Sequence, residues 1–254
     1  MKRLTTVLLF VCVAATSNGQ DVSAKELEKN KDFKSLINSI ISWGEIGNAK
    51  GVQGEMRLVT RSTKNGLDYT TYEMYTTGLP RNQSYALFSW AINQAQPEVV
   101  SPVVYITPNG TLCSAKDQCK EKSNVIFGFI STKGEPHRLA LISKDGHHTL
   151  MVKVIPDPIT GSDQGCNLEV IRATPKFEGA IIRGKGFKPN ETIHYVSDSA
   201  GEVMTGEVGV QGDGTFVLVL APFVKGKDIG VDTVKLQGKA CAPTIKYKWG
   251  TSEE

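Results

Sequence analysis

Residues 244–249 read TIKYKW, and this short stretch indicates the fold class more clearly than any other part of the chain. Three apolar residues, Ile245, Tyr247 and Trp249, alternate here with lysines. Successive side chains of a β-strand point to opposite faces of the sheet, so the alternation places the apolar groups on a buried face and the lysines in solvent. The pattern predicts an antiparallel strand with one face in a core.

The segments that precede this strand have the same character back to residue 167. Turn signals separate the apolar runs, and Asp213-Gly214 before the run FVLVL is a strong one. Seven strands at this spacing are typical of an immunoglobulin-like sandwich, which we predict for residues 167–254. The predicted strands are 167–174, 180–183, 192–198, 202–210, 215–220, 231–237 and 244–249.

Residues 45–155 show strand patterns as well, and we predict a second β-sandwich domain there. Asn65-Gly66, Asn109-Gly110 and Asp145-Gly146 predict type I′ hairpin turns, in which both central residues have positive φ. No helical segment of about ten residues fits between the strands, so an all-β fold with antiparallel sheets is expected. The predicted strands are 52–60, 67–77, 84–92, 99–107, 125–131, 138–144 and 148–155.

The segment between the two predicted domains is rich in Pro, Gly and polar residues, and reads PDPITGSDQG over residues 156–165. We interpret residues 156–166 as an interdomain linker. Asp157, Ser162 and Asp163 are possible calcium ligands, but a calcium site needs about six oxygens and the alternating acidic loop is missing.

Residues 1–20 have the pattern of a secretory signal peptide. Lys2 and Arg3 precede the apolar run VLLFVCVAA, and small residues suit cleavage between Ala15 and Gln20. A short membrane anchor is the alternative, although a spanning helix needs about 20 apolar residues. We therefore expect a secreted, periplasmic or cell-surface protein without a transmembrane segment after cleavage.

Residues 21–44 follow with the spacing of an amphipathic helix, for which docking on the next domain is expected. Acidic residues interleave with its lysines and weaken the alternative of a membrane-surface helix. Its apolar positions are Phe33, Leu36, Ile37, Ile40 and Ile41.

The charge of the chain gives no reason to expect a nucleic-acid partner. Loss of Lys2 and Arg3 with the signal peptide lowers the formal net charge from +3 to +1. Such a weak field does not favour nucleic acid or an acidic membrane. The one local basic run, RGKGFK at residues 183–188, is interpreted as a solvated turn.

Four cysteines remain after cleavage removes Cys12, and export favours their pairing in disulfides. Four thiols allow three pairings. We favour Cys113 with Cys119 and Cys166 with Cys241, because each bridge then stays within one predicted domain. A four-cysteine zinc site is the alternative, but the first pair is spaced too widely and the second pair has no near neighbours.

Residues 175–191 contain a G-x-G-F pattern followed by a Pro-Asn-Glu turn. This stretch resembles the opening hairpin of IPT/TIG-like immunoglobulin-fold modules of secreted bacterial proteins, and the resemblance extends over residues 167–250 at most. Physically, Gly184 and Gly186 permit a tight turn, and Phe187 is expected to close the end of the sandwich. A dinucleotide-binding loop is rejected, because Pro189 stands where a third glycine is needed.

No catalytic signature emerges from the sequence, and we predict a non-catalytic protein with no cofactor and no metal site. The G-x-S-x-G, H-E-x-x-H, Walker and kinase motifs are all missing from the sequence. The adjacent His147 and His148 would face opposite sides of a strand. If the chain is catalytic, Asp145, His137 and His148 form the candidate cluster.

Aromatic residues that could stack on sugars fall in two predicted strands, where core packing is the favoured interpretation. Three N-x-S/T sequons, at Asn82, Asn109 and Asn190, would carry glycans only in a eukaryotic secretory pathway. The aromatic residues are Tyr69, Tyr72, Tyr75, Tyr85, Phe88 and Trp90.

Two classes of function follow from these patterns. The favoured class is an exported binding or structural module for an extracytoplasmic protein or glycan. A carbohydrate-binding or adhesion module is its sharpest form, and an exposed row of Trp and Tyr would mark it. The second class is an enzyme with an atypical site at the domain junction near residues 156–165. The ligand and the oligomeric state are left open.

Overall fold

The structure, a computed structural model, describes residues 48–64, 67–92, 94, 97–119, 125–130 and 132–250. The predicted signal peptide at residues 1–20 and the predicted helix at residues 21–44 lie outside these residues. The chain divides into two compact units. Unit 1 comprises Met1–Ser131 with His137–Val154, and unit 2 comprises Thr132–Pro136 with Ile155–Glu254.

The described part of unit 1 contains eight strands and a short 3₁₀ helix. These elements are β1 (Gln53–Lys64), β2 (Leu67–Thr77), β3 (Tyr85–Trp90), β4 (Glu98–Ile106), β5 (Leu112–Cys113), η1 (Lys116–Gln118), β6 (Phe127–Ile130), β7 (His137–Ser143) and β8 (Thr149–Val154). They form a three-stranded sheet, β1-β2-β6, and a five-stranded sheet, β5-β4-β3-β7-β8. Both sheets contribute to one core, since Met74, Phe127, Leu87 and Leu141 are all fully buried in it.

Unit 2 is a sandwich of two four-stranded antiparallel sheets. Its strands are β9 (Ile159–Asp163), β10 (Cys166–Arg172), β11 (Ala180–Lys185), β12 (Thr192–Ser199), β13 (Glu202–Gly209), β14 (Phe216–Leu220), β15 (Gly230–Gln237) and β16 (Thr244–Trp249). The sheet orders are β14-β11-β10-β9 and β13-β12-β15-β16. The chain crosses between the sheets after β11, β13 and β14, as in an immunoglobulin-like sandwich.

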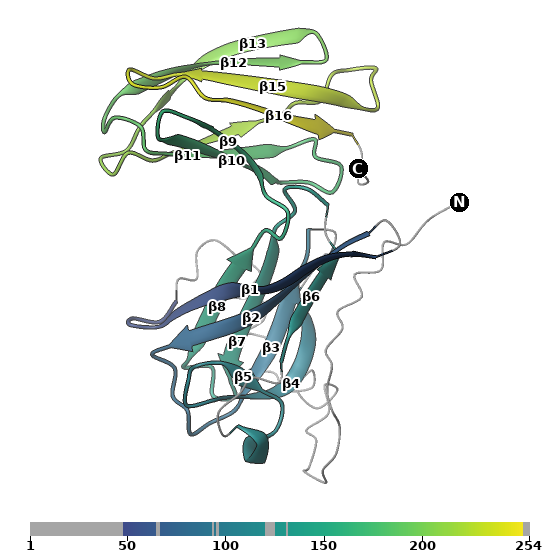
Figure 1. Ribbon diagram of the computed structural model, residues 1–254, viewed down its shortest axis with the longest axis vertical. Coiled ribbons are helices and arrows are strands. Elements are labelled where there is room, and N and C mark those ends of the chain that lie inside the picture. The colour runs from purple at the N-terminus through teal and green to yellow at the C-terminus, as the bar shows by residue number, and fades with distance from the viewer. Residues whose placement is uncertain are drawn as a thin grey trace. The chain divides into compact units, whose positions relative to one another are not determined.

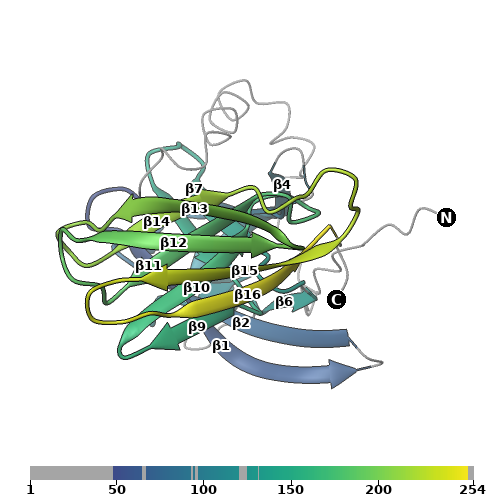
Figure 2. The ribbon, with the colours of Figure 1, turned by 90° about the horizontal axis from the view of Figure 1, so that it is seen from above.

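The two layers of unit 2 can be followed in the figures. Strands β13, β12, β15 and β16 lie side by side in Figure 1, and Figure 2 shows this sheet from above. Val170 and Ile182 of one sheet meet Ile193 and Val234 of the other in a core where all four are fully buried. Burial of each such side chain stabilises the sandwich by about 1.5 to 3 kcal/mol, and this holds the two layers together.

In the part of the chain that the structure describes, the all-β antiparallel fold is confirmed, and every predicted strand overlaps a strand of the structure. Two strands were not predicted, namely β5 and β9. The linker interpretation of residues 156–166 is therefore wrong over β9, which pairs with β10 from Ile159 to Asp163. The Gly content of this segment has a packing reason instead: a Cβ on Gly161 would lie 2.6 Å from the carbonyl oxygen of Thr244.

Hairpin turns occur at Asn109-Gly110 and Asp145-Gly146, as the sequence predicts, but their type differs. Asp213-Gly214 is a turn between strands of different sheets and not a hairpin. In Asn109-Gly110, Asp145-Gly146 and Asp213-Gly214 only the glycine has positive φ, at 82°, 74° and 79°. This is the form of a type I turn followed by a left-handed glycine. The two-residue loops with positive φ at both positions are Gln164-Gly165 and Ala200-Gly201. Asn65-Gly66 lies outside the described residues.

Residues 132–136 belong to unit 2, whereas the predicted domain 45–155 includes them. The backbone N–H of Arg172 donates to the carbonyl of Gly134 at 2.8 Å, and the N–H of Gly134 donates to the carbonyl of Asp157 at 2.8 Å. The buried guanidinium of Arg172 adds hydrogen bonds to the carbonyls of Lys133 and Pro175. These bonds make the short segment a part of unit 2.

The stretch that resembles IPT/TIG-like modules closes one end of the unit 2 sandwich. Phe187 is buried and packs edge-on against Phe216, with ring centroids 5.1 Å apart. Gly184 lies in β11 and not in the turn. Its lack of a side chain leaves room for the ring of Phe216, which a Cβ would meet at 2.0 Å. The buried carboxylate of Glu191 accepts backbone hydrogen bonds from Lys188 and Lys239, both at 2.8 Å. The motif is therefore structural.

Two disulfides join the cysteines in the favoured pairing. Cys113 is bonded to Cys119, with Cα atoms 5.6 Å apart, and Cys166 to Cys241, with Cα atoms 6.3 Å apart. The first closes a loop in unit 1 around η1. The second links β10 of one sheet of unit 2 to the loop before β16 of the other.

Candidate binding surface

The outer face of the sheet β14-β11-β10-β9 in unit 2 carries a groove with a volume of about 810 Å³. Alternate residues of these strands point away from the core, so one side of each strand is available to line the groove. The lining residues are Thr160, Gly161, Ser162, Asn167, Leu168, Glu169, Arg183, Gly184, Lys185, Gln211, Thr215, Phe216 and Val217.

Cross-strand register determines which side chains stand together in this groove. Glu169 of β10 lies opposite both Thr160 of β9 and Arg183 of β11. Arg183 in turn lies opposite Val217 of β14. The row therefore runs across the sheet from a hydroxyl through two charges of opposite sign to an exposed valine.

A second row of polar groups lies beside the first. Asn167 is opposite Ser162 on one side and Lys185 on the other. Carboxylate, guanidinium, ammonium, amide and hydroxyl groups are thus spread over one sheet face, and they can donate and accept hydrogen bonds along an extended ligand.

Strand β14 forms the apolar border of the groove. Its inward side chains belong to the core, whereas Val217 and Val219 are 53% and 69% exposed. A polar sheet face next to an exposed apolar margin resembles the anatomy of protein interfaces, in which apolar area excludes water and polar groups give specificity.

The basic residues of the groove lie in a strand, whereas the sequence predicts a turn there. Residues 183–188 were interpreted as a solvated turn, but Arg183 and Lys185 lie in β11 and project from the sheet face. Only the part from Gly186 onward forms the turn. The alternation of Arg183 and Lys185 at i and i+2, in continuation of a predicted strand, was the signal that could have located this face.

The outer face of the opposite sheet of unit 2 also carries charged residues. Lys246 and Lys248 of β16 are exposed there. His194 of β12 contacts Glu207 of β13 at 3.1 Å in a pair that is largely exposed. This face offers a matched reference for experiments on the groove.

A polar network in the core of unit 2 was not predicted. The hydroxyl groups of Ser197 and Tyr247 donate to the two carboxylate oxygens of Asp232, at 2.9 and 2.7 Å. Burial raises the pKa of Asp232, and these hydrogen bonds oppose the rise. Burial also raises the pKa of Tyr247, with a further contribution from the charge of Asp232. All three side chains are buried inside the sandwich, where the network has a structural role.

The candidate catalytic cluster of the sequence analysis is not assembled. His137 begins β7, while Asp145 and His148 lie in the turn after β7. Six residues of extended strand separate the two ends by about 20 Å. A hydrogen bond from Ser143, together with one from the backbone of His147, lowers the pKa of Asp145, which thereby caps its own turn.

His137 instead lines a separate cavity of about 330 Å³ in unit 1. Its ring lies 4.6 Å from that of Phe129, and the guanidinium of Arg138 lies 5.3 Å from the ring centre of Trp90. Burial lowers the pKa of Arg138. The cavity lies at the end of the five-stranded sheet where β3 ends and β4 and β7 begin.

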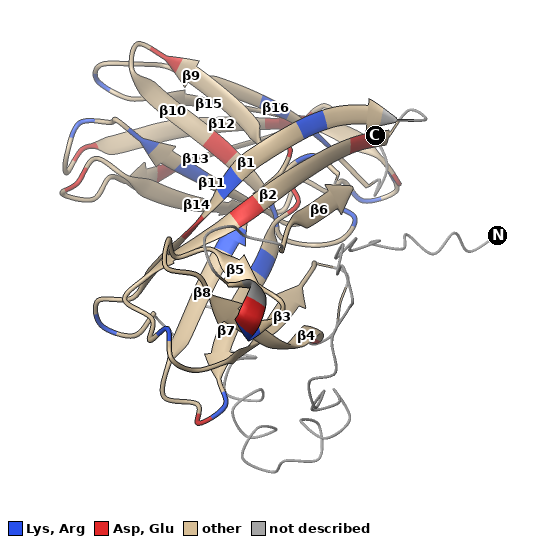
Figure 3. Ribbon diagram, turned by 60° about the horizontal axis from the view of Figure 1, so that its bottom comes forward, with Lys and Arg blue, Asp and Glu red and all other residues tan. Residues whose placement is uncertain are grey.

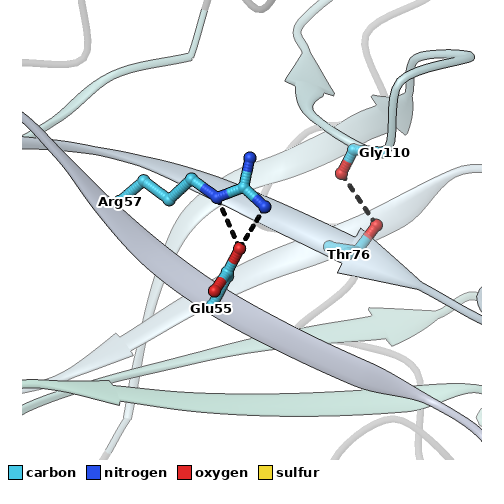
Figure 4. Close-up of polar contacts among 4 residues, drawn as sticks. All are labelled: Glu55, Arg57, Thr76 and Gly110. Carbon is cyan, nitrogen blue, oxygen red and sulfur yellow. Dashed lines mark hydrogen bonds and ion pairs between the residues drawn. The ribbon is translucent and has the colours of Figure 1, made fainter.

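The first two strands of unit 1 carry charged residues of both signs, which Figure 3 colours along the β1–β2 hairpin. Figure 4 shows the guanidinium of Arg57 paired with the carboxylate of Glu55 on the same strand face. The hydroxyl of Thr76 donates to the carbonyl of Gly110 at 3.0 Å, so the Asn109-Gly110 turn is anchored to β2. These contacts are surface pairing and turn anchoring.

The aromatic residues and possible calcium ligands that the sequence offered do not form a binding site of the predicted kind in the described residues. The aromatic residues Tyr72, Tyr85 and Phe88 are buried, and in the described ranges no Tyr or Trp falls in the exposed class. Asp163 accepts a hydrogen bond from the backbone N–H of Ala242 at 2.7 Å. Among the residues that the structure describes, no three His, Cys, Asp or Glu side chains come together around a possible metal ion.

The three sequons all present an exposed asparagine, namely Asn82, Asn109 and Asn190. In the second sequon, however, the hydroxyl of Thr111 is buried and bonded to Thr107 at 2.7 Å.

Comparisons with known proteins place the chain in no family. No protein-family model matches it, and no curated protein matches it. Among solved structures, one similar chain is the tetra-tandem repeat in the extending region of a large adhesion protein, with 13% identity and a TM-score of 0.28. The alignment covers 78% of this chain and 49% of that one, so this chain spans about half the length of that structure. At this TM-score the likeness supports no functional conclusion.

The described ranges contain no helix that is long and apolar enough to cross a bilayer.

Proposed function

We propose that this chain is an exported, non-catalytic binding protein that holds an extracytoplasmic protein partner on the outer face of sheet β14-β11-β10-β9. The observation that carries the proposal is the groove of about 810 Å³ on that face, where Glu169, Arg183 and Lys185 stand beside the exposed valines of β14. Polar groups that are spread along a sheet face beside an exposed apolar margin fit an extended protein segment.

Export is supported by the signal-peptide pattern of residues 1–20 and by the two disulfides. Disulfides persist in oxidising compartments and are rare in the cytosol. The resemblance of residues 175–191 to IPT/TIG-like modules is consistent with the immunoglobulin-like sandwich of unit 2. Assignment to that group of modules is part of the proposal.

The charges of the groove can be tested against those of the opposite face. The double variant Arg183→Glu with Lys185→Glu reverses two charges on the groove, whereas Lys246→Glu with Lys248→Glu makes the same change on the other sheet of unit 2. Fluorescently labelled protein, starting at residue 21, is titrated onto the cells that produce it. We expect the groove variant to bind at least tenfold more weakly and the matched variant to bind like the natural chain.

The same assay distinguishes the class of partner. Protease treatment of the cells should remove the binding sites, whereas periodate oxidation of surface glycans should leave them. Removal by periodate alone would establish the alternative, a carbohydrate-binding module. Equal loss of binding in both charge variants would overturn the assignment of the groove.

A further inference from the structure

Strand β14 has the properties of an unprotected sheet edge. It stands at the margin of the sheet β14-β11-β10-β9, and among the described strands it pairs with β11 alone. One side of its backbone therefore lies outside the ladder of that sheet. Exposed backbone donors and acceptors of this kind form a template for pairing with another strand.

The sequence of β14 makes this edge apolar on both faces. It reads FVLVL from Phe216 to Leu220, with Phe216, Leu218 and Leu220 in the core and Val217 and Val219 exposed. Natural edge strands are usually blunted by a lysine, a proline or a bulge. The strand holds neither lysine nor proline, and its register with β11 is regular from end to end.

The same five residues are self-complementary. When the strand is reversed about Leu218, Val217 exchanges places with Val219, and Phe216 with Leu220. In a two-fold contact residue i of one copy meets residue j of the other and the reverse, so the pairs that come together here, valine with valine and phenylalanine with leucine, are all apolar. No charged residue lies in the strand, so antiparallel pairing of two copies brings no like charges together.

We propose that a second copy of this chain docks on this edge, with the two β14 strands paired antiparallel about Leu218. Val217 of one copy then lies opposite Val219 of the second copy, and the two four-stranded sheets become one continuous sheet. The exposed valines of both copies form a single apolar patch across the two-fold axis.

The margin of the other sheet enlarges this contact. Strand β13 is the margin of β13-β12-β15-β16, and it contacts β14 across the sandwich. Met204 of β13 is 43% exposed and shares a sheet face with the buried Ser197 opposite it, so it projects on the side of the other sheet. A stable interface buries roughly 1,600 Å² in total, more than two short strands supply, so this side chain is needed to extend the apolar contact.

Cross-linking tests the register of the pairing. Two single variants of the chain, Val217→Cys and Val219→Cys, are prepared separately, mixed and oxidised mildly. In the proposed register these two positions face each other within disulfide reach, whereas equal positions are offset diagonally and too far apart. We expect covalent dimers in the mixture and at least tenfold fewer in either variant alone. Dimers that form equally well in the separate samples, or none in the mixture, would overturn the proposal.

A blocked edge tests the same contact without cross-linking. Val219→Lys introduces a charge at the margin, and Ile229→Lys, at a site 66% exposed, is the matched control away from it. By sedimentation at the same concentration, we expect the dimer fraction to fall at least tenfold in the first variant and to be unchanged in the second. Equal dimerisation of the two variants would contradict the proposal, and unchanged melting temperatures would show that both fold.

The charges of the groove can be changed without changing β14, although Val217 borders both the groove and the edge. Arg183→Glu with Lys185→Glu changes β11 and leaves the edge of β14 intact. That variant should dimerise like the natural chain even if it loses its partner, so the two proposals fail separately.

Discussion

Unit 1 and unit 2 are both built from antiparallel sheets, but their chains are fastened in different ways. The disulfide of unit 1 joins Cys113 to Cys119 and closes a local loop, whereas that of unit 2 joins Cys166 to Cys241 across a sequence separation of 75 residues. The bridge in unit 2 links a strand of one sheet to the loop before a strand of the other, and that in unit 1 closes a loop next to β5. The unit that carries the groove therefore has the bridge that spans the longer segment of chain.

Two polar contacts reinforce the same end of unit 2. The loop of residues 238–243, which contains Cys241, is held by the carboxylate of Glu191 through Lys239 and by that of Asp163 through Ala242. A braced sandwich keeps the sheet face rigid, and a rigid face loses less conformational freedom when a partner binds.

Removal of the Cys166–Cys241 bridge should have the largest effect on the stability of unit 2. Loop-closure arguments predict that Cys166→Ser with Cys241→Ser lowers the free energy of unfolding of unit 2 by about 4.5 kcal/mol. The matched variant, Cys113→Ser with Cys119→Ser, removes a bridge that closes a far shorter loop. It should lower the free energy of unfolding of unit 1 by about 2.4 kcal/mol. Denaturant titrations read at Trp249, which is buried in unit 2, measure the first change. A larger loss from the short bridge would break the comparison.

Loss of the Glu191 carboxylate should be the next largest effect. Glu191→Ala leaves the backbone N–H groups of Lys188 and Lys239 without their acceptor in a buried setting, at a cost of about 2 kcal/mol. Glu178→Ala replaces an exposed glutamate in the same unit and is the control. Thermal unfolding of both variants tests the role of this contact. Equal melting temperatures of the two would contradict it.

The buried Asp232 should make unit 2 depend on pH in a defined direction. Its pKa is raised by burial, so its contribution to stability is fully present below its unfolded pKa and is lost as the pH rises through the folded pKa. The side chain introduced by Asp232→Asn does not titrate. Over that pH range the variant should therefore gain stability relative to the natural chain, by about 1.4 kcal/mol for each pH unit by which the folded pKa of Asp232 exceeds its unfolded pKa. Unfolding free energies at pH 3 to 8 measure this, and a gap that does not widen with pH would refute it.

The smallest expected effect belongs to the exposed pair His194 and Glu207 on the opposite sheet. Exposed ion pairs contribute about 0.2 to 1 kcal/mol and are screened by salt. A double-mutant cycle with His194→Ala and Glu207→Ala should therefore give a coupling energy below about 1 kcal/mol. A larger value would show that this face also contributes to the bracing of unit 2.

The strands and the cysteine pairing followed from the sequence because period-two alternation and local spacing are direct consequences of strand geometry and chain connectivity. The pattern in Thr244–Trp249, for instance, is reproduced by the structure, with every second residue buried. Strand β9 was missed because its glycine serves a close approach to Thr244, which depends on a strand about 80 residues away.

The groove was not predicted for a related reason. Glu169 and Arg183 acquire their relation only through the register of β10 and β11, and Val217 joins them from β14. Sequence spacing gives the face on which each side chain lies but not its cross-strand neighbours. The prediction of type I′ turns was wrong for a similar reason. The neighbouring backbone decides whether Asp145 or Asn109 adopts positive φ, and neither does.

A photo-reactive side chain placed at a single position tests the central claim most directly. Full-length protein with benzoylphenylalanine at Lys185, in the groove, or at Lys246, on the opposite sheet, is added to the producing cells and irradiated. The account predicts one covalent protein adduct from position 185 and none from position 246. Adducts from position 246 alone, or the same adduct from both, would contradict a partner held on the sheet β14-β11-β10-β9.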